Sequence, residues 1–164
     1  MTRRVFWVLC TLLIFTQCGI RDGFDQPIGN NKKVRVYLFS AQWCDSCKDE
    51  MIELDHLLKT EFSAKAAQVL ITVYTVTDVR KFPPNPAAAE AFKKEMVDLH
   101  GVDFETVVDP WIYQNYRQYF DWNGGDIPAV VVLDETGEEV LKKFRPGSGF
   151  TAADIIDFLW GALS

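Results

Sequence analysis

Two cysteines three residues apart, Cys44 and Cys47, are the side chains of this sequence best suited to do chemistry. When such a pair occupies the first turn of a helix, its Cα atoms lie about 5.5 Å apart, a distance that a disulfide spans without movement of the backbone. The pair can therefore open to two thiols and close again. The spacing indicates disulfide exchange, in which a thiolate attacks a disulfide sulfur.

The hydrophobic pattern around the pair predicts a different role for each sulfur. An apolar run at 34–39 predicts a central strand, and a helical pattern starts at Cys44, which therefore stands at a helix N-terminus. The unpaired N–H groups there favour the thiolate and lower a cysteine pKa from about 8.5 to between about 3.5 and 7.5, so Cys44 is the predicted nucleophile. Cys47 falls on the apolar side of the helix and suits a resolving thiol. Asp45 places a negative charge beside Cys44, which opposes part of the helix effect and favours a reductase.

Other uses of a cysteine pair fit this sequence less well. A structural zinc needs about four ligands, and the two histidines, His56 and His100, lack the paired spacing of zinc fingers and ribbons. A covalent c-type haem needs a histidine directly after the second cysteine, where this chain has Lys48. A purely structural disulfide over so short a loop would add little stability. We therefore expect no metal and no cofactor beyond the disulfide itself; thiolates that hold a soft metal such as Cu(I) are an alternative.

The helix that starts at Cys44 is predicted to run to about residue 65. Its apolar side chains recur at steps of three and four on one face: Cys47, Met51, Leu54 and Leu58. Asp49, Glu50 and Glu53 are predicted to face elsewhere. A β-rich run at 68–76 follows, and a strand, helix and strand of these lengths form a right-handed parallel crossover.

The second half of the chain adds helices and two more strands. An Asn-Pro start signal and a terminal glycine predict a helix at 86–100, and an Asp-Pro signal predicts an aromatic-rich helix at 111–120. Strands at 127–133 and 138–144 are joined by so short a connection that they must form an antiparallel hairpin. A capping box at Thr151 opens the last helix. This order predicts an α/β sandwich, a mixed sheet flanked by helices.

Composition limits the classes of function. The chain has 164 residues, 48% of them hydrophobic and 24% charged, which is typical of one water-soluble domain and excludes a disordered or multi-span membrane protein. The net charge is −6, and no cluster of lysine and arginine breaks that acidity. We therefore expect no nucleic-acid partner.

The N-terminal segment has the pattern of a targeting signal. Residues 1–17 carry two arginines, then an apolar run at 5–16, and no acidic residue, as in an export signal. The run ends at Cys18, and this junction resembles the lipobox of bacterial lipoproteins, in which the cysteine becomes the lipidated first residue. An uncleaved anchor and a plain secreted protein are the alternatives. Residues 18–32 are predicted to be a flexible tether, and 33–164 the folded domain.

Three segments together make the chain resemble the thioredoxin superfamily and, within it, the membrane-tethered extracytoplasmic bacterial proteins of the TlpA and ResA type. The resemblance covers residues 33–162 and rests on YLFSAQWCDSCKDEM, VVDPW and DIPAVVVLDETGEEV. It implies a thioredoxin-like three-layer sandwich with a helical insertion before the strand that begins with a cis-proline.

The resemblance also implies roles for residues outside the cysteine pair. Pro128 matches the cis-proline that packs beside the cysteines, and Ile127 matches the residue whose backbone pairs with bound substrate. Trp43 matches an aromatic that shelters the reactive sulfur. The buried aspartate of cytosolic thioredoxins is replaced by Leu38. Asp78 matches the acidic residue that ResA-type proteins carry after the second strand, so we expect it to transfer protons or to tune the cysteine pKa.

These observations predict a thiol-disulfide oxidoreductase in an extracytoplasmic compartment, the bacterial periplasm, that works as a reductase. Its partners would be exported proteins with cysteines, an upstream thiol that donates electrons, and the membrane through a lipid anchor on Cys18; we expect a monomer. A disulfide oxidase or isomerase of envelope proteins is an alternative within the same class. A non-catalytic lipoprotein that uses the fold to bind a partner or a soft metal is the alternative outside it.

Overall fold

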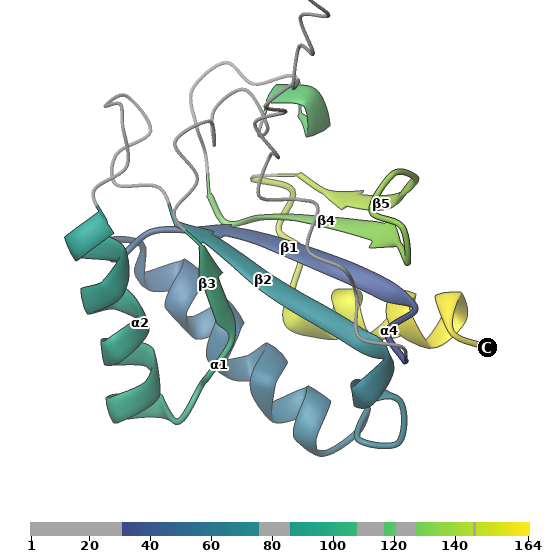
Figure 1. Cartoon of the computed structure of the whole chain (residues 1–164), viewed down its shortest axis with the longest axis horizontal. Coiled ribbons are helices and arrows are strands. Elements are labelled where there is room, and N and C mark those ends of the chain that lie inside the picture. The colour runs from purple at the N-terminus through teal and green to yellow at the C-terminus, as the bar shows by residue number, and fades with distance from the viewer. Residues whose placement is uncertain (1–30, 76–85, 108–116, 121–126, 146) are drawn as a thin grey trace, which may run out of the picture.

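A mixed sheet runs through the middle of the molecule. The computed structural model describes residues 31–75, 86–107, 117–120, 127–145 and 147–164, and within them five strands form one sheet in the order β3-β2-β1-β4-β5 (Figure 1). The strands are β1 (Val34–Ser40), β2 (Val69–Thr75), β3 (Glu105–Val107), β4 (Ala129–Asp134) and β5 (Val140–Phe144). The helices are α1 (Asp45–Lys59), α2 (Pro86–His100) and α4 (Ala152–Ala162), with a 3₁₀ turn, η1 (Ala66–Gln68), before β2.

Strand β1 is the centre of the sheet, and its position explains its composition. All seven of its residues are buried, because β1 has a strand on either side and side chains packed on both faces. It pairs in parallel with β2 and antiparallel with β4. The antiparallel pairing sets Phe39, near the end of β1, opposite Ala129, the first residue of β4. The end of β1 and the start of β4 therefore lie side by side, where β1 leads into α1.

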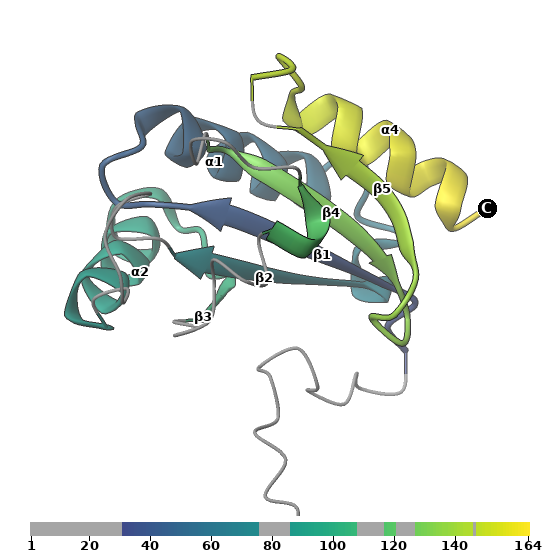
Figure 2. The same ribbon diagram turned by 90° about the horizontal axis from the view of Figure 1, so that it is seen from above.

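Helices α1 and α4 cover one face of the sheet (Figure 2). The apolar face predicted for α1 is confirmed, since Cys47, Met51, Leu54 and Leu58 are all buried. Leu54 packs in one hydrophobic cluster with Val36 and Leu38 of β1 and with Ile155 of α4. Helix α2 adds Phe92 and Met96 to the same cluster. Removing this apolar surface from water is the main force that holds the helices on the sheet.

Aromatic side chains dominate the opposite face of the sheet. Phe39 of β1 stacks on Tyr74 of β2 with the ring centroids 5.8 Å apart, and Phe120 meets Phe39 edge-on at 6.2 Å. Tyr119 belongs to the short helical segment 117–119 and Phe120 follows it directly; these residues are the described part of the helix predicted at 111–120. Both cysteines belong to this aromatic cluster, so the third layer of the predicted sandwich covers the sheet beside the cysteine pair.

Two elements differ from those predicted. Helix α1 ends at Lys59 rather than near residue 65, because the backbone N–H and the hydroxyl of Thr60 both donate to the carbonyl of His56 and close the last turn. Strand β3 was not predicted. It has three residues, too few for a periodic signal, and it is ordered by parallel pairing with β2.

The predicted hairpin is confirmed, with β4 and β5 antiparallel. Its connection is held by Asp134, whose Oδ1 accepts the backbone N–H groups of Gly137, Glu138 and Glu139 at 2.9, 3.0 and 3.1 Å. Gly137 has φ +82°, a left-handed conformation that side chains rarely adopt.

No helix within the described ranges is long and apolar enough to cross a membrane. The expected export signal, the cysteine at position 18 and most of the expected tether lie outside the described residues.

Candidate active site

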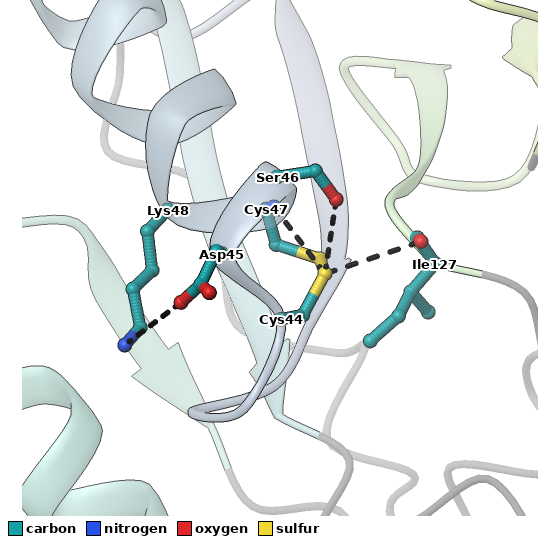
Figure 3. Close-up of a disulfide and its surroundings, with 6 residues drawn as sticks. All are labelled: Cys44, Asp45, Ser46, Cys47, Lys48 and Ile127. Carbon is teal, nitrogen blue, oxygen red and sulfur yellow. Dashed lines mark hydrogen bonds and ion pairs between the residues drawn. A yellow bond between two sulfur atoms is a disulfide. The ribbon is translucent and has the colours of Figure 1, made fainter.

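Cys44 caps the N-terminus of helix α1. Its backbone is extended, with φ −97° and ψ 93°, and its N–H donates to the carbonyl of Ala41 at 3.0 Å. The backbone N–H of Cys47 donates to the Cys44 sulfur at 3.3 Å (Figure 3). This sulfur therefore occupies the place that a serine, threonine or aspartate oxygen usually takes at a helix start. The predicted position of Cys44 at a helix start is confirmed; the stabilised thiolate expected there stays a prediction.

The two cysteines form a disulfide. The Sγ–Sγ distance is 2.08 Å and the Cα–Cα distance is 5.3 Å, within the reach predicted for the pair. Cys44 is 6% exposed and Cys47 is 1% exposed. An incoming reagent therefore reaches the Cys44 sulfur more readily, as the predicted roles of nucleophile and resolving thiol require.

Ser46 adds a second donor to the Cys44 sulfur. The Ser46 Oγ lies 3.5 Å from Sγ, and since a disulfide sulfur carries no hydrogen, the hydroxyl is the donor. Sequence reasoning assigned no function to this residue, because no sequence pattern showed that its hydroxyl would face the Cys44 sulfur. A hydroxyl at this position is placed to donate to a Cys44 thiolate after reduction.

The start of β4 faces the cysteine pair from the other side. The Ile127–Pro128 peptide bond is cis, as the resemblance implied. The Ile127 carbonyl oxygen lies 4.0 Å from the Cys44 sulfur, and Figure 3 shows it directed at that sulfur. The antiparallel pairing of β1 with β4 causes this approach, since it brings the first residues of β4 to the point where β1 ends.

Trp43 lies directly before the reactive cysteine and is 54% exposed. The resemblance implied that it shelters the sulfur, and this role stays a prediction. Its large apolar side chain is more than half in water and adjoins the buried Cys44 in the chain. Asp78, the predicted proton-transfer residue, lies outside the described residues.

Three charged side chains adjoin the cysteines. Lys48 directly follows Cys47, and its ammonium lies 2.8 Å from Glu95 Oε1 of α2 and 3.8 Å from Asp45 Oδ1 (Figure 3 shows the contact with Asp45). The contact with Lys48 is the main reason that the pKa of Glu95 lies below its usual value. Sequence reasoning missed Glu95, because 47 residues separate it from Lys48 and no local pattern joins them.

Glu50 was predicted to face away from the protein interior, and this prediction was wrong. Desolvation by burial, with repulsion from Glu53 and from Asp154 of α4, raises the pKa of Glu50 to about 7. Its Oε1 is buried and has no hydrogen-bond partner among the described residues. A signal for this was present in the sequence: Glu50 lies three residues after Cys47 and four before Leu54, on the edge of the apolar face. A carboxyl that titrates near neutrality one turn from a thiol is a candidate for proton transfer.

Within the described ranges, no group of three or more histidine, cysteine, aspartate or glutamate side chains is arranged to hold a metal ion. The ligands that the described part of the cysteine site offers are its two sulfurs, after reduction.

Comparisons with known proteins support the fold. No family model matches the chain, and no curated protein sequence matches it. Among solved structures, StoA from Bacillus subtilis is 19% identical over 79% of this chain and 84% of its own, with a TM-score of 0.50. DsbF from Mycobacterium tuberculosis is 19% identical, covers 82% of both chains and has a TM-score of 0.53. A thiol:disulfide interchange protein, DsbE, from Chlorobium tepidum is 18% identical over 82% of both chains, with a TM-score of 0.55. With the mixed sheet, the flanking helices and the cysteine pair at the start of α1, these similarities show that the chain has a thioredoxin-like fold.

Proposed function

We propose that this protein is a thiol-disulfide oxidoreductase that exchanges its Cys44–Cys47 disulfide with cysteines of exported proteins. The observation that carries the proposal is the hydrogen bond from the Cys47 backbone N–H to the Cys44 sulfur. A sulfur in this position loses its proton more easily than a free cysteine, because the helix N-terminus stabilises the thiolate. The closed disulfide and the greater exposure of Cys44 complete the requirements for exchange.

In the reductase direction the dithiol form starts the reaction. The Cys44 thiolate attacks one sulfur of a client disulfide, which forms a mixed disulfide and releases the other client sulfur as a thiolate that takes up a proton. Cys47 then loses its proton and attacks the Cys44 sulfur, which breaks the mixed disulfide, closes the Cys44–Cys47 bond and releases the second client thiol. Two electrons pass from the dithiol to the client disulfide, and an upstream thiol restores the dithiol.

Cys47 needs a proton acceptor for the second step, because its sulfur is buried and a buried thiol resists ionisation. The resemblance assigns this task to Asp78. Glu50 is a second candidate, since it lies one turn along α1 and its pKa of about 7 suits the exchange of a proton near neutrality. Asp78→Asn and Glu50→Gln can be compared by the pH profile of the single-turnover rate. The variant that slows release of the mixed disulfide without slowing its formation identifies the acceptor.

The client is proposed to bind along Ile127 and Trp43. The backbone at Ile127 borders the Cys44 sulfur and can pair with an extended client segment, which would bring a client cysteine close to the nucleophile. Trp43 offers an exposed apolar surface next to it. Pro128 follows Ile127 directly and stands next to the first residue of β4, so we propose that it helps to place the Ile127 carbonyl. This arrangement recognises backbone and apolar surface, which suits clients of many sequences.

The charge next to the nucleophile supports the reductase direction. Asp45 is adjacent to Cys44 in the chain, and its side chain is 94% exposed, so its negative charge raises the free energy of the thiolate and makes the dithiol a better electron donor. A reduction potential nearer to about −120 mV than to about −270 mV would favour an oxidase instead.

The proposed location is outside the cytoplasm, with the chain held at the membrane by a lipid on Cys18. One structurally similar protein, 17% identical over 79% of this chain, is described as a secreted Mycobacterium tuberculosis disulfide oxidoreductase homologous to E. coli DsbE. That description concerns the neighbour; the export pattern of residues 1–17 is the support from this chain. Incorporation of labelled fatty acid that survives Cys18→Ser would remove the anchor from the proposal.

The exchange activity is tested by reduction of insulin with the wild-type chain, Cys44→Ser and Cys47→Ser. The proposal requires that both substitutions abolish turnover and that only Cys47→Ser accumulates a mixed disulfide, because it keeps the nucleophile and loses the resolving thiol. Turnover that persists in Cys44→Ser would refute the assignment of the nucleophile. Retention of a stoichiometric soft metal without turnover would favour the alternative of a non-catalytic protein that uses the fold to bind a metal.

A further inference from the structure

Glu95 contacts the segment that carries the cysteine pair. Its carboxylate accepts a hydrogen bond from Lys48 at 2.8 Å. Lys48 follows Cys47 directly. A side-chain hydrogen bond from Gln42, two residues before Cys44, makes a smaller contribution to the lowered pKa of Glu95. A carboxylate on α2 is therefore paired with the residue next to the second sulfur.

The two carboxylates around Lys48 are unequal partners. The contact with Glu95 is the shorter one, and the side chains of Lys48 and Glu95 are only 18% and 26% exposed. Asp45 is 1.0 Å farther from the ammonium (3.8 against 2.8 Å) and 94% exposed. Pairs in water are weak and are screened by salt, whereas partly buried pairs keep more of their attraction. The Lys48 ammonium thus contacts both carboxylates, with Glu95 of α2 as the closer and less exposed partner.

This division of charge affects the reactive sulfur. The Asp45 carboxylate is next to Cys44 in the chain, and its field opposes ionisation of the thiol. If Glu95 lost its charge, Lys48 would be able to approach Asp45 more closely than 3.8 Å and would cancel a larger part of that field. The direct repulsion between Glu95 and the thiolate would also disappear. Both changes act in the same direction, toward an easier loss of the Cys44 proton.

We propose that Glu95 is a positioning residue that draws the Lys48 ammonium closer to itself than to Asp45 and thereby limits the reactivity of Cys44 from helix α2. This inference rests on the proposed function of the cysteine pair. Helix α2 contributes no residue to the exchange itself. Through Glu95 it would nevertheless influence the nucleophilic strength of Cys44.

The test is the pH dependence of Cys44 alkylation by iodoacetamide in the reduced full chain, followed by mass spectrometry. For Glu95→Gln we expect the apparent pKa of Cys44 to fall by about 0.3–0.5 units, the size of one unit charge acting through water-rich surroundings. Below that pKa, alkylation would be about two- to threefold faster. At about 1 M NaCl, where the Debye length is about 3 Å, the difference between the two proteins should nearly vanish.

Two controls separate this electrostatic role from a structural one. Asp98→Asn makes the same change of charge on the same helix, but Asp98 pairs with Lys94 of α2, so the Cys44 profile should not move. Glu95→Asp keeps the charge and should restore most of the wild-type profile. A Glu95→Gln protein that unfolds at lower temperature and keeps the wild-type profile would show a structural brace and overturn the proposal.

A double-mutant cycle tests the pathway through Lys48. In a Lys48→Met background, Glu95→Gln should lose the part of its effect that acts through the ammonium and keep only the direct effect of removing the Glu95 charge, so the shift should be smaller than in the wild-type background. An undiminished shift in that background would overturn the proposed pathway. Alkylation reports on the Cys44 thiol without a client, so its outcome is separate from the insulin assay: loss of the proposed function would appear there and not in the alkylation profile.

Discussion

Helices α4 and α1 satisfy the unpaired N–H groups of their first turns with different acceptor atoms. Helix α4 begins with a capping box, in which the Thr151 hydroxyl accepts the Asp154 N–H at 3.4 Å and the Asp154 carboxylate accepts the Thr151 N–H at 2.8 Å. Helix α1 begins with a sulfur, which accepts the Cys47 N–H at 3.3 Å. Both arrangements satisfy donors that the first turn of a helix leaves unpaired.

The two caps differ in the acceptor atom, which is oxygen at α4 and sulfur at α1, and this difference decides whether the helix start contributes to folding stability or to the reactivity of a side chain. At α4 the reciprocal bonds use strong oxygen acceptors, and the pKa of Asp154 is lowered by the backbone and side-chain hydrogen bonds from Thr151. At α1 a weak acceptor takes the same place, and the stabilisation that a cap would contribute to folding is available instead to a thiolate. The same electrostatic property of a helix start therefore stabilises the fold at α4 and, in the proposed function, activates the Cys44 nucleophile at α1.

The largest expected difference between the two caps is the loss of activity without loss of stability in Cys44→Ser. Serine is a good N-cap, so the substitution should leave the free energy of unfolding within about 0.5 kcal/mol of the reduced wild-type protein. Insulin reduction should fall to background, because a serine hydroxyl does not ionise near neutral pH. Urea unfolding in excess reductant and the turnover assay measure the two quantities. A large loss of stability together with the loss of activity would contradict the view that this position is a cap with an added function.

The second effect is expected from Thr151→Ala, which breaks the cap of α4. We expect a loss of about 1 kcal/mol in the free energy of unfolding, the usual cost of removing a threonine cap. The alkylation rate of Cys44 should not change, since Thr151 caps a different helix. Thr151→Ser, which keeps the hydroxyl, is the matched control and should recover most of the loss in urea unfolding. A changed alkylation rate in Thr151→Ala would show that the two helix starts are coupled.

Features set by neighbours in the chain could be predicted from the sequence. The apolar face of α1, the position of Cys44 at its start and the capping box of α4 each depend on residues within about one or two turns, where spacing fixes geometry. The cis bond before Pro128 was implied by the resemblance, not by local pattern, since a proline at the start of a strand is compatible with either isomer. Strand β3 escaped prediction because only its pairing with β2 orders three residues.

Features set by tertiary contacts could not be predicted in the same way. Glu95 joins the site from a helix that the sequence places far away, and only folding brings its carboxylate to Lys48. Glu50 was misassigned because its face of α1 is covered by α4, whose docking no local pattern in α1 reveals. Polar residues at the edge of an apolar face are therefore the positions at which periodicity is least informative.

The smallest expected effect concerns Glu50, which tests whether the starts of α1 and α4 are electrostatically coupled. It is one turn after Cys47 on α1 and is repelled by Asp154 of the α4 cap. Its pKa in the folded protein, about 7, is above the value of 4.5 for an unperturbed glutamate. The native state therefore holds a proton that the unfolded chain releases, and stability falls as pH rises from about 4.5 through about 7.

Removing this carboxyl should accordingly stabilise the protein at high pH and leave it unchanged at low pH. For Glu50→Gln we expect the free energy of unfolding of the oxidised chain to equal that of wild type at about pH 4 and to exceed it by about 0.5 kcal/mol at about pH 8. That gain is a fraction of the free energy that corresponds to the full pKa shift, since the side chain is partly exposed and its charge is screened by water. Urea unfolding at both pH values gives the difference. Glu61→Gln, an exposed position beyond the end of α1, makes the same change of charge and should show no such dependence on pH. An equal gain at both pH values would assign the effect to packing and would leave the two helix starts electrostatically independent.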